Sequence, residues 1–145
     1  DGIPALNATA VVYLRSRQME GEAADEIHGP QVLGSGNASG GKFIGAIDHG
    51  HWLKFSGIQL ERVRKVNLRV ASAGAGGAIE IRCDSSDGEL LATVPVEVNG
   101  NWEQFYDRSV EIPERSGRHD LYLRFINEQQ RGGLMNLDAI HFLPE

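Results

Sequence analysis

The sequence predicts an all-β protein, either a sandwich of antiparallel sheets or a barrel. Short segments in which apolar and polar residues alternate recur along the chain, as in strands with one buried face. Glycine-rich stretches separate them, and the chain contains 18 glycines, which suits many tight turns. Apolar residues do not recur three and four positions apart over several turns, so no long amphipathic helix is expected.

Eight segments carry the strand pattern, and turn signals lie between most of them. In chain order the segments are 11–22, 51–60, 65–73, 78–86, 90–98, 102–112, 119–126 and 137–143. The turn signals are GSGNASGG (34–41), GAGG (74–77), SSDG (85–88), NGN (99–101), RSG (115–117) and QRGG (130–133). The stretch EAADEI (22–27) is the one helical signal, and it is long enough for a single turn.

The chain has the length of one domain. Its 145 residues can bury a core without disulfides or metal staples, so we expect a single domain over residues 1–145. The N-terminal DGIPALNATA (1–10) is expected to be a loose end or the remnant of a linker.

The net charge and the lack of long apolar runs argue against two classes of partner, nucleic acid and membrane. The formal net charge is -6, which lacks the long-range attraction to phosphate that nucleic-acid binders need. No run approaches the roughly 20 apolar residues of a membrane span, so no membrane partner is expected. No signal peptide is visible, although a mature or trimmed chain would lack one.

Cysteine and histidine do not form a recognisable motif. Cys83 is the only cysteine, so an internal disulfide is excluded. A buried, inert thiol is the simplest interpretation, while a catalytic thiol would need a histidine partner that only the fold could supply. The five histidines show no zinc-binding spacing, and no nucleophile-elbow pattern is present.

The stretch GLMNLDAIHF (133–142) places an amide and a carboxylate two residues apart. Side chains two apart on a strand share a face. Asn136 and Asp138 therefore face either a ligand and an ion or plain solvent.

Six stretches, taken in order, resemble the family 6 carbohydrate-binding modules over residues 19–142. They are MEGEAADEIHGPQV, GGKFIGAIDHGHWLKF, LRVASAGAGGAIEIRCDSSDGELLATVPV, NGNWEQF, HDLYLRF and GGLMNLDAIHF. The resemblance implies a jelly-roll β-sandwich of two antiparallel sheets with a structural calcium. It also implies a non-catalytic role, in which the module holds a covalently attached enzyme against a polysaccharide outside a bacterial cell.

The same resemblance implies a set of calcium ligands. Glu20 and Glu22 match the family's opening pair of acids, Asp138 matches its closing aspartate, and Lys42 would offer its backbone carbonyl. Ca²⁺ takes six to eight oxygen ligands, which suits carboxylates and carbonyls. The plain alternative for Asp138 is a solvated carboxylate at a sheet edge.

The expected sugar site combines an aromatic ring with an amide. Trp102 matches the family's loop tryptophan, on which a sugar would stack, and Asn136 matches the amide that hydrogen-bonds sugar hydroxyls. The family commonly places a second aromatic residue where this chain has Ala46, so Phe43 or His49 is expected to replace that ring. The alternative for Trp102 is a tryptophan in or beside the core.

A second sugar cleft, on the concave face of a sheet, is open from the sequence. Tyr106, Glu103 and Arg69 alternate on candidate strands there, although cross-strand packing and surface pairing are the favoured explanation for them. Trp52 is expected in the core because LKF continues its strand.

The sequence therefore predicts a secreted, non-catalytic module that binds a polysaccharide or oligosaccharide such as xylan, β-glucan or agarose. One alternative is a structural or protein-binding sandwich that has lost its sugar. The other is a small glycoside hydrolase, for which Glu20 and Glu22 would supply the paired carboxylates.

Overall fold

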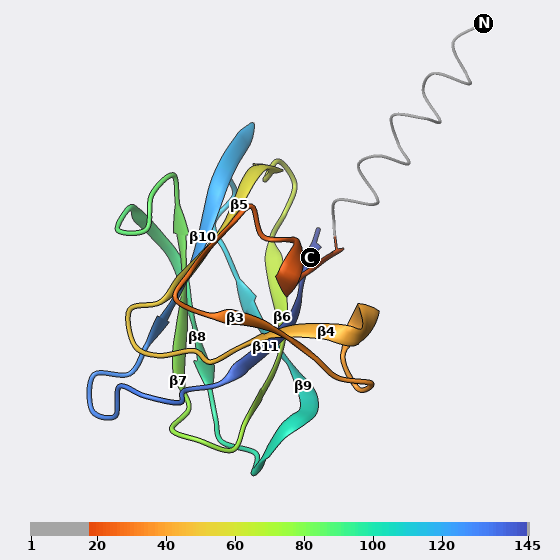
Figure 1. Cartoon of the computed structure of the whole chain (residues 1–145). Coiled ribbons are helices and arrows are strands. Elements are labelled where there is room, and N and C mark those ends of the chain that lie inside the picture. Colours follow the sequence, from red (N-terminus) through yellow and green to blue (C-terminus); the bar gives the residue numbers. More distant parts are fainter. Residues whose placement is uncertain (1–17, 145) are drawn as a thin grey trace, which may run out of the picture.

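The computed structural model describes residues 18–144, and it shows two antiparallel sheets packed face to face (Figure 1). The N-terminal segment 1–10, expected to be loose, lies outside the described residues. The strands are β1 Gln18–Glu20, β2 Glu26–His28, β3 Gln31–Gly34, β4 Lys42–Gly45, β5 Trp52–Gln59, β6 Lys65–Ser72, β7 Gly77–Cys83, β8 Glu89–Val96, β9 Asn101–Glu111, β10 Arg118–Ile126 and β11 Asn136–Leu143. The all-β, jelly-roll prediction is confirmed.

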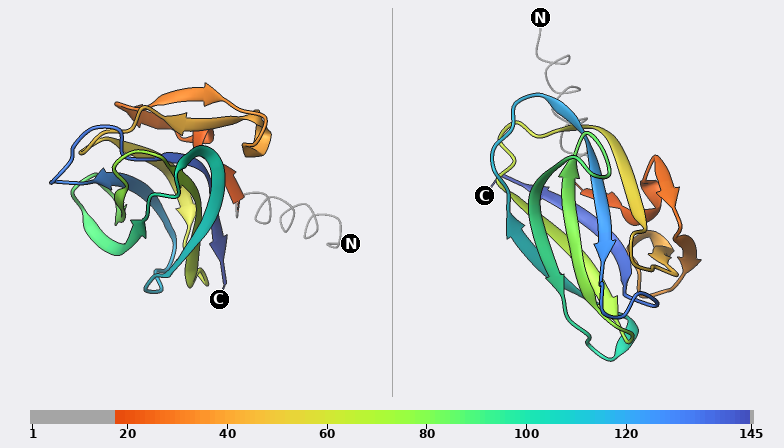
Figure 2. Two further views of the ribbon diagram at one scale, coloured as in Figure 1. Left: turned by 90° about the horizontal axis from the view of Figure 1, so that it is seen from below. Right: turned by 90° about the vertical axis from the view of Figure 1, so that its left-hand side faces the viewer.

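The two sheets draw their strands from distant parts of the chain. A six-stranded sheet has the order β3-β4-β11-β6-β9, with β1 also paired to β11. A five-stranded sheet has the order β2-β5-β10-β7-β8. The β3–β4 hairpin lies across one side of the sandwich (Figure 2) and is joined to the longer strands by the pairing of β4 with β11.

The core fills the space between the sheets. Inward-facing side chains alternate with outward-facing ones along each long strand, as a half-buried strand requires. The six-stranded sheet contributes Val66, Leu68, Val70, Ile140 and Phe142, and the five-stranded sheet contributes Leu53, Phe55, Ile79, Ile81, Leu121, Leu123 and Phe125. All of these are at most 1 % exposed, so the scaffold that holds the surface loops is rigid.

The seven strands from β5 onward coincide with predicted segments, although five of them, β7 to β11, begin one residue earlier than predicted. The short strands β2, β3 and β4 were not predicted. Residues 22–27 form a 3₁₀ turn at Gly21–Ala23 followed by β2, instead of a turn of α-helix. β2 and β4 are stabilised by pairing with the longer strands β5 and β11, and β3 is stabilised by pairing with β4. This is a tertiary effect that local residue patterns do not report.

Strand β11 is the element that positions the candidate site. Along one edge it pairs first with β4, at Leu137 and Ile44, and then with β1, at residues 139–141. On its other edge the register with β6 shifts between Leu137 and Ala139. Asp138 is the residue at this irregularity, which is where a β-bulge re-aims side chains.

Trp52 is not in the core, contrary to the sequence-based expectation. Its neighbours Leu53 and Phe55 are buried, so strand alternation turns the indole to the outer face of the five-stranded sheet, where it is half-buried. No helix in the described part of the chain has the length and apolarity to span a membrane.

Candidate functional site

Three carboxylates converge where β1, η1 (Gly21–Ala23) and β11 meet. Both side-chain oxygens of Asp138, which is fully buried, accept the backbone N–H of Ser39 at 2.9 and 3.0 Å. The Ser39 hydroxyl in turn donates to Glu20 Oε1 at 2.9 Å. Glu22 lies close enough to Glu20 and Asp138 for their charges to repel its own.

Two oxygens of this carboxylate cluster lack hydrogen-bond partners. Glu20 Oε2 and Glu22 Oε1 are buried without a hydrogen-bond partner. Burial raises the pKa of both Glu22 and Asp138 above the ordinary carboxyl value. Such orphaned oxygens are costly, and a hard cation that binds oxygen would satisfy them, so the donor set fits Ca²⁺.

Two further residues border this cluster. Gly40 has a φ of 70°, and a Cβ built on it would lie 3.3 Å from Glu20 Oε1 and 3.5 Å from Glu22 Oε2. A bare glycine thus leaves room between the carboxylates and the loop. Lys42, the predicted carbonyl donor, begins β4 two residues later. Arg69 Nε, at 3.5 Å from Asp138 Oδ2, partly offsets the negative charge.

A second feature is a pocket of about 330 Å³ between the β3–β4 hairpin and β9. Mostly apolar side chains line it. They belong to Leu33, Phe43, Ala46, Ile47, Trp102, Gly133, Met135 and Asn136. Three of the four predicted sugar-site residues, Trp102, Asn136 and Phe43, are therefore brought together in one concavity, which is the form that small-ligand sites take.

Trp102 stands at the rim of this pocket with 39 % of its surface exposed. A Cβ built on Gly74 would lie 2.6 Å from Cη2 of the indole, so only a glycine lets the ring lie this close to the 73–76 loop. The Asn136 amide donates from Nδ2 to the Trp102 carbonyl oxygen at 2.8 Å. Gly74 thus packs against the indole ring, and the Asn136 hydrogen bond fixes the backbone of Trp102.

The other predicted aromatic substitutes differ in position. Phe43 lines the pocket but is only 5 % exposed, and it packs against Phe105 at a ring-centroid distance of 5.7 Å. His49 does not line the pocket, and its Nδ1 accepts the backbone N–H of Asn127 at 3.0 Å. Ala46 is exposed and has a φ of 53°, so the pocket has no aromatic ring at this position.

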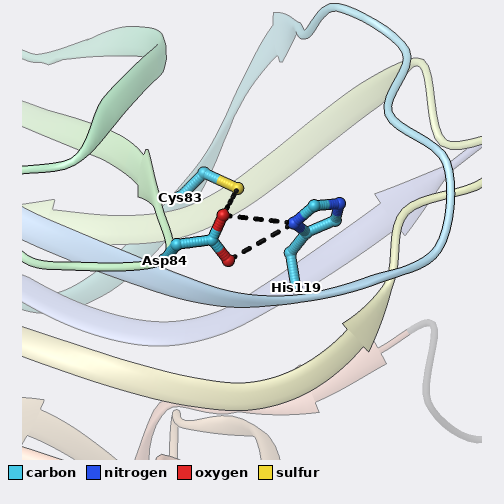
Figure 3. Close-up of side chains that lie close together, drawn as sticks. All are labelled: Cys83, Asp84 and His119. Atoms are coloured by element: carbon cyan, nitrogen blue, oxygen red, sulfur yellow. Dashed lines mark hydrogen bonds and ion pairs between the residues drawn. The ribbon is translucent and has the colours of Figure 1, made fainter.

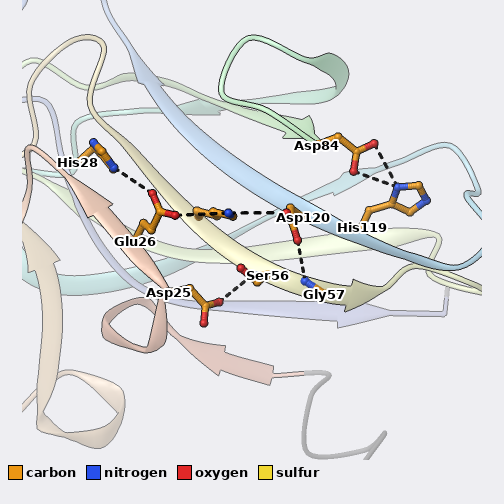
Figure 4. Close-up of polar contacts among 9 residues, drawn as sticks. Asp25, Glu26, His28, Ser56, Gly57, Asp84, His119 and Asp120 are labelled. Atoms are coloured by element: carbon orange, nitrogen blue, oxygen red, sulfur yellow. Dashed lines mark hydrogen bonds and ion pairs between the residues drawn. The ribbon is translucent and has the colours of Figure 1, made fainter.

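The outer face of the five-stranded sheet carries a separate aromatic row. His28 stacks on Trp52 with ring centroids 3.8 Å apart, and Trp52 lies 5.2 Å from Tyr122. A chain of polar contacts runs beside it, from His28 through Glu26 and Lys54 to Asp120 (Figure 4). Hydrogen bonds from His28 and Lys54 hold the pKa of Glu26 below its ordinary value.

The residues predicted for a second cleft lie on the other sheet. Tyr106 and Glu103 belong to β9 and Arg69 to β6, both in the six-stranded sheet. Tyr106 donates its hydroxyl to the Glu97 carbonyl at 2.6 Å, and Arg69 lies over the Phe105 ring. Their packing contacts agree with the structural interpretation that the sequence left open.

Cys83 is buried, and a histidine does lie near it, His119 on the adjacent strand β10. Burial, together with a hydrogen bond to Asp84, raises the pKa of the Cys83 thiol to about 11. A nucleophilic cysteine needs the opposite shift. Without a cation bound to the thiol, the arrangement therefore does not suit thiolate catalysis.

Comparison with known families agrees with this geometry. Residues 20–144 match the family model described as "Carbohydrate binding module (family 6)". The chain belongs to the family 6 carbohydrate-binding modules. The matched segment includes β11 and β9, so Asp138, Asn136 and Trp102 all lie within it.

Two solved family 6 modules share the fold closely. A module from Clostridium cellulolyticum, solved in complex with xylose, superposes with a TM-score of 0.81 at 31 % identity, covering 87 % of this chain and 95 % of that one. A β-1,3-glucan-binding module from Bacillus halodurans gives a TM-score of 0.80 at 35 % identity, covering 86 % of this chain and 93 % of that one.

Curated relatives of the module are larger enzymes. Endo-1,4-beta-xylanase A of Thermoclostridium stercorarium is 30 % identical over 112 residues, which is 77 % of this chain and 20 % of the xylanase. Arabinoxylan arabinofuranohydrolase of Paenibacillus polymyxa is 30 % identical over 115 residues, which is 74 % of this chain and 18 % of the relative. The chain thus spans about a fifth of these relatives.

Proposed function

We propose that this module is non-catalytic and binds a β-glycan of the xylan or β-glucan type at the pocket beside Trp102. The observation that carries the proposal is the half-exposed Trp102 ring at the rim of an apolar pocket that Asn136 also lines. Sugar rings stack their apolar C–H faces on an indole, while a nearby amide hydrogen-bonds their hydroxyls.

The way Trp102 is held supports a binding role. Of the residues that the structure describes, none stacks an aromatic ring on this indole. The amide of Asn136 and the bare Gly74 fix the ring without covering its exposed side. A platform that is rigid before the ligand arrives loses little conformational entropy on binding.

We also propose that Ca²⁺ binds Glu20, Glu22, Asp138 and the Lys42 carbonyl. The orphaned oxygens of Glu20 and Glu22 support this assignment. The ion would stabilise the fold, because it joins the first described strand to the last one. Asp138 is fully buried, whereas Trp102 on β9 is partly exposed, so we expect the ion not to contact the sugar.

The lengths of the relatives suggest a role for this module within a longer protein. Since the chain matches about a fifth of a xylanase and of an arabinofuranohydrolase, we propose that it is attached to a polysaccharide-acting catalytic domain outside a bacterial cell. Binding would keep that domain at its substrate by raising the local substrate concentration.

The outer face of the five-stranded sheet is the second candidate location. Trp52 and Tyr122 lie side by side there, with Lys54 Nζ 5.9 Å from the centre of the Tyr122 ring. However, His28 already covers one face of Trp52. Trp102 is therefore the stronger platform.

Affinity gels and calorimetry with xylan, mixed-linkage glucan, laminarin and agarose, in calcium, test the proposal. Trp102→Ala should abolish binding, and Trp102→Phe should retain part of it because a ring remains. Leu90→Ala is the matched control, since Leu90 is an exposed apolar side chain (45 %) on the other sheet.

Three outcomes are distinguishable. Loss of binding in Trp102→Ala with an unchanged melting temperature supports the pocket. Binding that survives in Trp102→Ala and disappears in Trp52→Ala moves the site to the five-stranded sheet. Absence of binding to every glycan by the wild type contradicts the proposal and favours a sandwich that has kept the fold without the sugar.

A further inference from the structure

Cys83, Asp84 and His119 form a cluster of potential metal ligands at one end of the sandwich. One ligand atom from each residue lies within 4.8 Å of the others. Cys83 ends β7 and His119 lies at the start of β10, its antiparallel neighbour. The three side chains point toward a common space (Figure 3), and the cluster lies on the five-stranded sheet, apart from the sugar pocket and the carboxylate cluster.

The spacing of the atoms suits a tetrahedral ion. Cys83 Sγ lies 3.4 Å from Asp84 Oδ2, and His119 Nδ1 lies 3.3 Å from each Asp84 oxygen. Around Zn²⁺, bonds of about 2.3 Å to sulfur and about 2.0 Å to nitrogen and oxygen place tetrahedral ligands ~3.3 to ~3.5 Å apart. The sulfur–oxygen distance and the two nitrogen–oxygen distances already have these values. The sulfur and the nitrogen lie within 4.8 Å of each other.

The second nitrogen of His119 is held as in metal-binding histidines. His119 Nε2 lies 2.9 Å from the Ser116 carbonyl oxygen, which can only accept a hydrogen bond. The Nε2–H bond therefore fixes the tautomer of the neutral ring, and Nδ1 presents a lone pair to the carboxylate. A lone pair facing two carboxylate oxygens is unfavourable unless a proton or a metal ion lies between them.

The positions of the residues in the strands are also unusual. Alternation along β10 places His119 on the same face as Leu121, Leu123 and Phe125, all fully buried in the core. A polar ring thus occupies the end of an apolar row and meets the buried thiol of Cys83. Asp84 has a φ of 73°, a left-handed backbone conformation that is uncommon outside glycine.

The cluster is accessible from one side. The Asp84 side chain is 65 % exposed and the His119 ring 24 %, so an ion can enter past them and a fourth ligand can be water. Arg115, whose positive charge acts on the Cys83 thiol, is paired with Glu89, the strand partner of Cys83. The charges around the site therefore do not oppose a divalent cation.

We propose that Cys83 Sγ, Asp84 and His119 Nδ1 bind one divalent transition-metal ion of the Zn²⁺ type. Thiolate and imidazole ligands select such an ion over Ca²⁺, which prefers oxygen. Binding exchanges the thiol proton of Cys83, released to solvent, for a metal–sulfur bond. The site joins the 84–88 hairpin to β10 and is independent of the calcium and sugar sites.

The experiment uses the full chain saturated with Ca²⁺, titrated with Zn²⁺ by calorimetry and with Co²⁺ by absorbance. One equivalent of Zn²⁺ should bind. The Co²⁺ complex should show a near-ultraviolet thiolate charge-transfer band and the visible bands of a four-coordinate ion. Cys83→Ser and His119→Gln should each lose Zn²⁺ binding and the thiolate band. His141→Gln, which alters a histidine of the other sheet, should retain both.

The simpler explanation is an ion pair between protonated His119 and Asp84. In that case the wild type would show no saturable Zn²⁺ binding, and Co²⁺ would give no thiolate band, which would overturn the proposal. Zn²⁺ binding that persists in both variants would also overturn it. The Co²⁺ spectrum of the wild type decides the question even if a variant fails to fold.

Discussion

Ser39 and Asp138 are 99 residues apart, and the backbone N–H of Ser39 donates to both carboxylate oxygens of Asp138 at 2.9 and 3.0 Å. This contact fastens the loop before β4 to the last strand. The Ser39 hydroxyl extends the contact to Glu20 at the start of the described chain. The proposed calcium ligands are therefore held together by hydrogen bonds within the protein, although two of their oxygens remain unsatisfied.

Removing calcium should lower the melting temperature. An ion that binds the folded state at 100 times its dissociation constant adds about 2.7 kcal/mol, which corresponds to a shift on the order of 5–10 °C for a domain of this size. Differential scanning calorimetry of calcium-loaded and EDTA-treated protein measures it. Glu22→Gln should reduce the shift, whereas Glu128→Gln, on an exposed loop, should not. Identical melting curves with and without EDTA would refute the calcium assignment.

The stabilisation by calcium should shrink as the pH falls. Burial raises the pKa of Glu22 and Asp138 in the metal-free protein. Such groups bind protons more tightly when folded, so the metal-free fold loses stability as the pH rises from about 4 to the raised values. Protons also compete with the metal. The gap in melting temperature should be largest near neutral pH and small near pH 4.5. A gap that widens on acidification would contradict this account.

Gly74→Ala should weaken glycan binding. The added Cβ would lie 2.1 Å from the Gly133 carbonyl oxygen and 2.6 Å from the Trp102 ring, so the loop and the indole must move. We expect a loss of stability of about 1–3 kcal/mol from overpacking, together with lower affinity on the gel. Gly132→Ala is the control, because the nearest atom to its Cβ is Asp48 Oδ1 at 3.8 Å. Equal affinities of the two variants would argue against a fixed Trp102 platform.

Asn136→Asp should be destabilising although it hardly changes the shape of the side chain. The amide Nδ2 donates to the Trp102 carbonyl, and a carboxylate oxygen in its place would face another acceptor. Leaving a buried group unsatisfied costs about 1–3 kcal/mol. Urea denaturation measures this loss, and calorimetry should show weaker glycan binding. Unchanged stability would mean that the hydrogen bond is not formed in solution.

Ala46→Tyr should strengthen glycan binding. Ala46 is exposed and lines the pocket, at the position where the sequence resemblance led us to expect a second ring. One added stacking contact of about 1 kcal/mol corresponds to an affinity gain of roughly fivefold. Ala46→Ser serves as the control because it adds a polar group without a ring. A weaker complex with tyrosine would indicate that the open space is itself used by the ligand.

The long strands and the family membership could be predicted from the sequence. Strands β6 and β10 alternate apolar and polar residues along most of their length, and that pattern is local to each segment. The motifs around Glu20, Trp102 and Asn136 follow one another in the order typical of the family, so the sequence predicts the family without any tertiary contact. The strands β3 and β4 were missed, because glycines surround them and tertiary pairing stabilises them: β3 pairs with β4, and β4 pairs with β11.

Only the tertiary structure decided which residues meet. The alternation of side chains along β5 places Trp52 outside the core although its neighbours are apolar. The loop around His49 directs the imidazole ring to Asn127 rather than to the pocket. The pairing of β7 with β10 brings His119 to Cys83, which lies 36 positions earlier in the chain. Local alternation specifies which face of a strand is buried, but the register between distant strands determines which side chains share a site.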